Sequence, residues 1–596
     1  LAEHTANPVH TLIMTIGEAN AAVEQAEDGL LCLLDAQIRV ESGWLEPLLE
    51  LLDAPGRRPE VVGATPCVVD GGGRVVEAGT MVARDGSWYP VGVGIEADDP
   101  GVRFARPVDG SSRLLVLERD AFLRIGGLDE GFTTFAAAVM DLCFRLAEHG
   151  GTVWYEPSSR VTSASAPLAV GDAQPVEGEW STVRERHRAA LEHRPLVEDL
   201  ERFPHRAVSV RDALALDRVL LIDDRVPHHD RGAGDPRMRQ IVEEMISLWP
   251  KARITLLAAD PKGARKYAPA LLDEGIEVVW PSDVEAWLKT RLFHYSVVVV
   301  SRPHNFGRFD EALRRTQPQA LRVYDVEALF FRRLDRMKPV VDSQPDRDAL
   351  RELLRRDRTW EVTAAAEADA AWCVTTEEAA VLSSVAPSTA RFALAYFAEA
   401  RAHPPGFASR ADLLFFAGFL AGAGSANEDA VLQVVEEIMP RLWKYDAGLK
   451  LHVVGADPTP AVRALDSELV NVVGHVEDPR PWFDQTLVHV APMRFGSGLK
   501  LRFVETIAAG LPLVTSSVGA EGLALGDLTG ALVADDPDAQ ASLVVDLITD
   551  GSRWEGTQRG VLAVAGERFS RKRFRSDLVE AMSHLGVAPP ADLDAV

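Results

Sequence analysis

The sequence has 596 residues, which is too long for one hydrophobic core and predicts about three or four domains. Its net charge of −26 and isoelectric point of about 5.1 argue against a nucleic-acid partner and against broad adhesion to an anionic membrane. Small phosphate-bearing ligands remain compatible with this charge, because they need only a local basic cluster.

Composition and cysteine usage favour a cytoplasmic protein. The hydrophobic content of 47% is ordinary for a soluble globular chain. The four cysteines are scattered without metal-ligand spacing, which indicates reduced thiols. No apolar run approaches the ~20 residues of a transmembrane helix, and no signal peptide is expected. The protein is therefore expected to be cytoplasmic, either free, peripheral at a membrane or held in an assembly complex.

Residues 1–165 are expected to form a first α/β unit. Apolar runs predict strands at 30–34, 61–69, 112–117 and 152–157, and helices are predicted at 121–127 and 141–148. Residues 166–216 are expected to be a connector, with a charged helix at 179–193.

Residues 217–380 alternate strands and helices, which predicts a parallel sheet of the doubly wound type. Buried strands are predicted at 218–222, 254–258, 277–279 and 296–301. Gly232, Gly234 and Arg237 follow the first of these strands, and His304 follows the last. Ligands of such sheets bind at the carboxyl ends of the strands, so these four residues are candidate ligand contacts.

A linker is expected at 381–410, followed by another α/β unit at 411–596. Its most informative stretch is residues 487–522, LVHVAPMRFGSGLKLRFVETIAAGLPLVTSSVGAEG. The pattern predicts a strand, a glycine loop at 494–498, a helix at 499–509, a second strand at 513–517 and a second glycine loop at 518–522. Both loops would lie at the ligand-binding ends of strands.

The first glycine loop suits an anionic ligand. Gly496 and Gly498 would let backbone N–H groups approach closely, at a helix N-terminus that favours negative charge. Lys500 and Arg502 are predicted in the first helical turn, where cations oppose the helix dipole, and a bound phosphate would explain them. Arg494 could grip a pyrophosphate through its forked guanidinium. The alternative is an ordinary crossover with solvated charges.

This stretch resembles the donor half of group 1 glycosyltransferases, which are retaining enzymes with the GT-B fold. The matching residues are Gly496-Ser497-Gly498, Glu505, Ala508-Ala509-Gly510-Leu511-Pro512 and Val518-Gly519-Ala520-Glu521-Gly522. Many members carry a glutamate at the position of Ser497, so its contact with the donor sugar is not carried over. A branch of the family has this small-residue loop with arginine and lysine instead, which fits Arg494 and Lys500.

The resemblance implies a GT-B pair, with the acceptor half at 217–380, the donor half at 411–596 and the last helix, 570–585, crossing back onto the acceptor half. Arg494 and Lys500 would neutralise the departing diphosphate and Glu505 would hold the ribose, which makes these three the catalytic candidates. The donor-binding candidates are Gly418, Gly496, Ser497, Gly498, Ser516, Val518 and Gly519. The acceptor-binding candidates are Gly232, Gly234, Arg237 and His304.

The first unit resembles the later part of a family 2 glycosyltransferase with the GT-A fold, through residues 43–48, 125–132, 140–146 and 153–161. Its catalytic positions differ from those of the family. The family's metal-binding aspartate, two residues after Asp35, is Gln37 here, and the acidic pair that supplies the base falls on Ala138 and Val139. The family's first strand should precede Asn7. We therefore expect an incomplete, degenerate GT-A-like domain with a structural or docking role.

The sequence thus predicts an α/β glycosyltransferase of polysaccharide biosynthesis. It would transfer a sugar, with retention, from a nucleotide-diphosphate donor to a hydroxyl of a glycan or lipid-linked saccharide. No metal or other cofactor is expected. Two alternatives stay open: a non-catalytic scaffold or ligand-binding subunit of a glycan-assembly complex, which the missing glutamate at Ser497 favours, and an epimerase or phosphorylase of the same architecture. A phosphorylase would need a pyridoxal phosphate lysine, and no clear candidate is visible.

Overall fold

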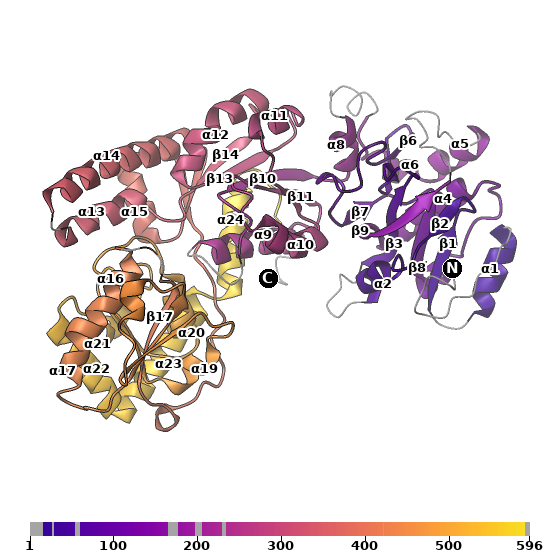
Figure 1. Cartoon of the computed structure of the whole chain (residues 1–596). Coiled ribbons are helices and arrows are strands. Elements are labelled where there is room, and N and C mark those ends of the chain that lie inside the picture. The colour runs from indigo at the N-terminus through magenta and orange to yellow at the C-terminus, as the bar shows by residue number, and fades with distance from the viewer. Residues whose placement is uncertain are drawn as a thin grey trace. The chain divides into compact units, whose positions relative to one another are not determined.

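The computed structural model describes residues 16–26, 29–53, 60–164, 177–196, 206–228, 234–341, 343–420, 422 and 424–589. The chain divides into two compact units (Figure 1). The first comprises Leu1–Leu220, Lys251–Ser296 and Ala312–Gln319, and the second comprises Leu221–Pro250, Val297–Glu311 and Ala320–Val596.

A mixed seven-stranded sheet forms the N-terminal part of the first unit. Its main path is β1-β8-β3-β9-β2, with β4 paired to β3 and β7 paired to β9. The strands are β1 (Leu30–Leu34), β2 (Ile38–Val40), β3 (Val61–Val69), β4 (Val75–Glu77), β7 (Arg106–Val108), β8 (Leu114–Glu118) and β9 (Thr152–Ser163). β5 (Thr80–Val82) and β6 (Trp88–Pro90) form a separate hairpin. The continuous apolar run of β3 is buried at every position but the last, which suits a central strand.

Helices border this sheet and continue into the connector. They are α1 (Ile16–Gln25), α2 (Glu46–Asp53), α3 (Arg119–Arg124), α4 (Phe135–Glu148), α5 (Glu177–Arg186), α6 (Arg188–Leu191) and α8 (Arg206–Arg211). The helix predicted at 179–193 is thus two helices, with His187 between them. The helix breaks there because the His187 ring is buried, stacks on Phe144 at 5.0 Å and bonds to the carboxylates of Asp141 and Glu148.

A buried ion network in the first unit joins α8 to the strands β11 (Ala252–Ala258) and β12 (Glu277–Val279). Asp212 is fully buried and accepts hydrogen bonds from Arg211 and from Arg253 at 3.1 Å. Glu277, also fully buried, accepts from Arg211 at 2.7 Å and from Arg291 at 2.8 Å. Three guanidinium groups therefore share two carboxylates away from water, an arrangement that depends on every partner being present.

The middle domain is built on a second seven-stranded sheet, in the order β12-β11-β10-β13-β14-β15-β16. The strands not yet given are β10 (Asp217–Asp223), β13 (Val297–Ser301), β14 (Leu321–Asp325), β15 (Ala370–Cys373) and β16 (Ala390–Ala393). Its helices are α9 (Asp235–Leu248), α10 (Ala264–Asp273), α11 (Val284–Lys289), α12 (Pro303–Thr316), α13 (Phe330–Met337), α14 (Gln344–Glu367) and α15 (Thr376–Val385). This is the doubly wound order, whose switch point lies between β10 and β13.

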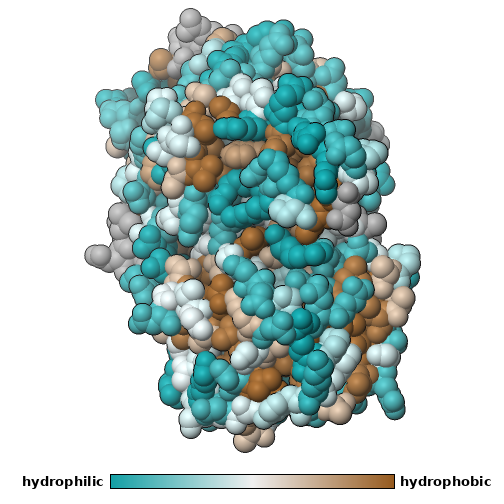
Figure 2. Space-filling view, turned by 90° about the vertical axis from the view of Figure 1, so that its left-hand side faces the viewer, coloured by the Kyte–Doolittle hydropathy of each residue, from teal (hydrophilic) through white to brown (hydrophobic). Residues whose placement is uncertain are grey.

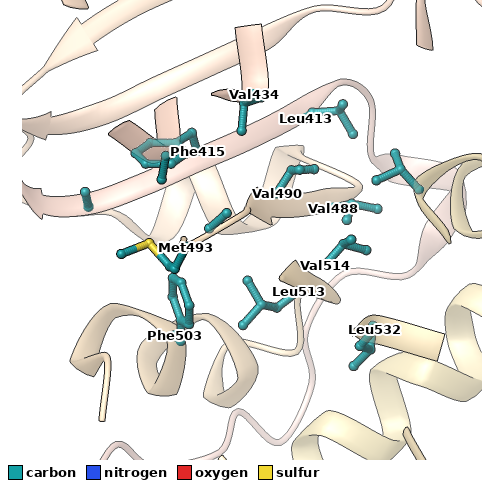
Figure 3. Packing of buried hydrophobic residues seen from close by; sticks show 14 of the residues in the cluster. Leu413, Phe415, Val434, Val488, Val490, Met493, Phe503, Leu513, Val514 and Leu532 are labelled. Atoms are coloured by element: carbon teal, nitrogen blue, oxygen red, sulfur yellow. The ribbon is translucent and has the colours of Figure 1, made fainter. Parts of the chain in front are cut away.

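The C-terminal domain holds a parallel five-stranded sheet in the order β19-β18-β17-β20-β21. The strands are β17 (Leu413–Phe419), β18 (Leu451–Ala456), β19 (Val470–Gly474), β20 (Val488–Ala491) and β21 (Leu513–Thr515). The helices include α16 (Ala426–Gln433), α17 (Met439–Leu442), α19 (Arg480–Gln485), α20 (Leu501–Ala508), α22 (Pro537–Thr549) and α23 (Gly551–Arg568). Figure 3 shows how apolar strand residues such as Phe415 and Val490 pack toward Phe503 of α20, which fixes that helix against the sheet.

The last helix, α24 (Arg571–His584), packs on the middle domain within the second unit. Arg571 and Arg575 both donate to the buried carboxylate of Glu244 in α9, each at 2.5 Å. The predicted return of this helix is therefore confirmed.

The predicted fold class is also confirmed: the protein is α/β, and two doubly wound domains are tied together by a returning helix as in GT-B proteins. One difference concerns 381–410, where a linker was expected and β16 instead extends the middle sheet. The GT-A-like assignment of the first unit stays a prediction. On the face drawn in Figure 2, hydrophilic residues surround several separate apolar areas. Along the described stretches of the chain, no helix combines the length and apolar character needed to cross a membrane.

Candidate functional site

A cavity of about 650 Å³ opens in the second unit, where the carboxyl ends of strands from both doubly wound sheets meet. Asp224 follows β10 and Arg302 follows β13, so the middle domain contributes its switch point. Gly418 lies in β17 and Ser497 lies in the loop after β20, so the C-terminal domain contributes its own. Open parallel sheets bind ligands at such crevices, which makes this cavity the candidate site.

The structure brings about half of the predicted site residues to this cavity. Those that line it are Gly234, Arg237, His304, Gly418, Gly496, Ser497 and Lys500. Those that do not line it are Arg494, Gly498, Glu505, Ser516, Val518 and Gly519. Gly232 lies outside the described residues.

Lys500 places a nearly buried amine at the edge of the cavity. It is the residue before the first turn of α20, so this helix begins later than predicted and Lys500 lies at its N-cap. The ammonium group donates to the carbonyls of Gly498 at 2.9 Å and Val518 at 2.6 Å, and lies 3.9 Å from Glu521. Burial lowers the pKa of Lys500 to about 8, against the opposing charge of Glu521. A second anion next to this amine would stabilise its charged form.

Ser497 presents an unused hydroxyl to the same cavity. Its Oγ is buried and has no hydrogen-bond partner among the described residues. An orphaned buried hydroxyl costs free energy unless a ligand or water satisfies it. The position that carries a glutamate in many group 1 enzymes therefore retains a hydrogen-bonding group here.

Arg494 and Glu505 have protein partners in this structure. The guanidinium of Arg494 pairs with Asp429 of α16, with Nε at 2.8 Å from the carboxylate. Glu505 accepts two hydrogen bonds of 2.8 Å from Arg502 and one of 3.0 Å from the hydroxyl of Tyr396. The three-residue spacing explains the first pair, since it puts Arg502 and Glu505 on one helix face. Arg502, which was not among the candidates, is the member that reaches the cavity.

Two glycines of the donor loops serve close packing against the middle domain. Gly498 has a φ of +67°, and a Cβ there would lie 3.3 Å from Glu378 and 3.5 Å from Ala328. At Gly522, with a φ of +80°, a Cβ would overlap the side chain of Thr375. The sequence suggested that Gly498 exposes N–H groups to phosphate. The structure gives it and Gly522 a second reason, which is the approach of another domain.

The middle-domain wall concentrates charge around a strained residue. Arg302 has a φ of +74°, which is uncommon for a side chain other than glycine. Its guanidinium lies 3.3 Å from Asp223 and also pairs with Asp224. Asp224 accepts from His304 at 2.6 Å, which orients the imidazole at the cavity edge. Sequence reasoning found His304 but missed its partner Asp224, whose only signal was a position just after a strand.

Arg237 also lines the cavity, but its guanidinium is engaged in the fold. It is almost fully buried and pairs with Asp325 at 2.9 Å, while its Nε donates to the carbonyl of Leu394 at 2.7 Å. Gly234 makes room for Glu327, whose carboxylate would overlap any Cβ at that position. Both residues thus shape the wall of the cavity.

The aspartates of the first unit are bound up in ion pairs. Asp141 is fully buried, and Arg145, Arg186 and His187 all bond to it. Burial alone would raise the pKa of Asp141, but these hydrogen bonds lower it to about 2. Asp129 pairs with Arg186 at 2.6 Å. These contacts fit the interpretation of both aspartates as residues of the fold.

Comparison with known proteins identifies one part of the chain. Residues 412–550 match the family model described as glycosyl transferases group 1, so these residues are a group 1 glycosyltransferase domain. The glycosyltransferase prediction is confirmed in this form. A Drosophila melanogaster protein named as a polypeptide N-acetylgalactosaminyltransferase is 28% identical over 150 residues, which are 24% of this chain and 22% of that protein. The chain therefore spans about a fifth of the length of that relative.

Two solved structures are similar in fold. Sucrose-phosphate synthase from Thermosynechococcus elongatus is 14% identical, with a TM-score of 0.48, over 62% of this chain and 99% of that one. The Anabaena protein HepE, solved with UDP and glucose, is 13% identical, with a TM-score of 0.47, over 62% of this chain and 99% of that one.

Proposed function

We propose that the cavity of the second unit transfers a sugar from a nucleotide-diphosphate donor to a hydroxyl of a glycan or lipid-linked saccharide. The observation that carries this proposal is the buried, cavity-facing ammonium of Lys500, at the start of a helix in the group 1 glycosyltransferase domain. Transfer with retention, without a metal and in the cytoplasm is part of the proposal and follows from the resemblance.

On the donor side, the charge on the departing diphosphate would be met by Lys500 and by the N-terminus of α20. Preorganised charge of this kind, held away from water, is usually the largest single contribution to such chemistry. The orphaned hydroxyl of Ser497 would bond to the donor. Arg494 and Glu505 would join them only by exchanging Asp429 and Arg502 for the ligand, and Gly498, Ser516, Val518 and Gly519 would support the loops from behind.

On the acceptor side, polar groups suited to sugar hydroxyls surround the strained Arg302. The carboxylate of Asp224 and the imidazole of His304 form one hydrogen-bonded pair at the cavity edge. Trp360 of α14 lines the same cavity with 41% of its surface exposed, as a ring on which a saccharide can stack. The acceptor is thus proposed to be a saccharide held by both hydrogen bonds and an aromatic face.

A nucleotide-sugar thermal-shift panel tests this function. A donor at a hundredfold excess over its Kd should stabilise the protein by about 2.7 kcal/mol, and the shift should be the same with Mn²⁺ and with EDTA. Product formation with the same donor is then followed by release of nucleoside diphosphate. A shift that disappears in EDTA would contradict metal independence. No shift with any donor would favour a non-catalytic scaffold.

The buried amine of Lys500 should make the reaction sensitive to alkaline pH. Its pKa is lowered to about 8 by burial, and the protonated form is the one that stabilises the diphosphate. We expect kcat/KM for the donor to fall as pH rises through about 8. Initial rates between about pH 6 and pH 10 measure this, and Lys500→Arg should lose the alkaline limb because a guanidinium stays charged there. An unchanged limb in that variant would assign the titration to another group.

A further inference from the structure

Helix α13 of the middle domain contacts both glycine loops of the C-terminal domain, within the second unit. Arg336 Nη1 lies 2.6 Å from the carboxylate of Glu521 and donates to the carbonyl of Gly496 at 2.8 Å. Arg332 Nη1 lies 2.6 Å from the other oxygen of Glu521. The four-residue spacing places both arginines on one face of the helix. One helix face therefore touches the first loop through Gly496 and the second through Glu521.

These contacts are shielded from water. The side chain of Glu521 is only 5% exposed, and those of Arg332 and Arg336 are 21% and 25% exposed. Burial alone would raise the pKa of Glu521, but the hydrogen bond from Arg336 and the nearby charges of Lys500 and Arg332 lower it below its usual value. Shielded pairs of this kind depend on both partners more than surface pairs do.

The contacts also reach the proposed donor site. Glu521 lies 3.9 Å from the ammonium of Lys500, and Gly496 lines the cavity beside Ser497. Below them, the backbone of Leu329 donates to Glu378 at 2.9 Å, next to the spot where Gly498 has no room for a large side chain. The glycine loop is thus held from the side that faces away from the cavity.

We propose that Arg332, Arg336 and Glu521 form an interdomain clasp that holds the glycine loop and Lys500 in the form that binds the donor. The three are positioning residues, since Arg332, Arg336 and Glu521 do not line the cavity themselves. A loop with two glycines loses much conformational freedom when it is ordered. The clasp supplies that order before the donor arrives, so its loss should weaken donor binding more than it slows the chemical step.

This inference rests on the proposed function, and two measurements separate them. The first is donor kinetics in Arg336→Ala and Glu521→Gln, with Arg351→Ala as the control because Arg351 is an exposed arginine of the same domain, paired only with its helix neighbour Asp348. We expect KM for the donor to rise about 10- to 100-fold in both clasp variants, with kcat within about threefold of wild type. The control should keep the wild-type constants.

The double variant sharpens the kinetic test. Because Arg336 and Glu521 act as one contact, the double variant should be no worse than either single variant, while independent roles would give multiplied losses. Arg336→Lys, which keeps the charge but not the fork, should lie between wild type and Arg336→Ala. A fall in kcat at unchanged KM, or fully multiplied losses, would overturn the clasp.

The second measurement needs no activity. Amide hydrogen exchange of residues 494–500 and 516–524 should be faster in the clasp variants and unchanged in Arg351→Ala, with the melting temperature recorded to confirm that each variant is folded. Unchanged exchange in folded clasp variants would overturn the proposal. Faster exchange in a protein that binds and hydrolyses no nucleotide sugar would support the clasp and refute the proposed function.

Discussion

Lys500→Ala should lower kcat/KM for the donor by about 10²–10³-fold, the usual loss when one preorganised electrostatic group is removed from a transfer site. The structure gives a specific reason. The ammonium already bonds to two loop carbonyls and sits 3.9 Å from Glu521, so no other cation can take its place without rebuilding the loop. Donor binding, followed by thermal shift or calorimetry, should weaken in parallel.

Gln37→Ala is the matched control for that result. Gln37 occupies the position of the metal-binding aspartate in the family that the first unit resembles, and its side chain is exposed. If transfer takes place in the second unit, this variant should keep activity close to wild type. Loss of activity in Gln37→Ala with retention in Lys500→Ala would move the active site to the first unit.

Asp212→Asn should be the most destabilising single substitution, with an expected loss of about 3–5 kcal/mol. The carboxylate is fully buried and is bonded by Arg211, Arg253 and His294. Neutralising it leaves the three guanidinium groups of the network facing only Glu277. Packing does not relieve this, because Arg211 and Arg253 both lie over the buried ring of Phe104.

Calorimetric unfolding against pH measures that loss. Because the pKa of Asp212 is held well below its usual value by its cationic partners, its contribution is present above the unfolded pKa of about 3.9 and is lost as pH falls through the lower folded value. The wild type should therefore lose stability more steeply in acid than the variant does. Glu352→Gln, which breaks an exposed pair with Arg355, should show no measurable change. A loss in Asp212→Asn no larger than in this control would show that the network does not need its charge.

Local pattern was enough to predict the strands but not their full number. Continuous apolar runs gave β1 and β3 with their observed bounds, since a strand buried on both faces leaves a clear signal. β16 was missed because its four residues are each only half-buried, as expected of an edge strand with no apolar run. The turn chemistry around Gly510 and Pro512 placed the end of α20 within one residue.

The site was predictable as a place but not as a set of contacts. The end of a strand, a glycine loop and a basic helix start led to Lys500 and Ser497, and both line the cavity. The partners of Arg494 and Glu521 could not be found this way, because Asp429 and Arg336 are far away in the chain and only the packed fold brings them near. Such pairings follow from tertiary structure, which periodicity does not encode.

The return of α24 to the middle domain has a consequence for how the chain is made. Glu244 of α9 leaves the ribosome more than 300 residues before its partners Arg571 and Arg575. The C-terminal sheet has all of its strands before α24 emerges, whereas the middle domain must wait for the last helix to cover Glu244. A premature stop shortly before Arg571 should therefore leave the domain that was translated last better folded than the one translated before it.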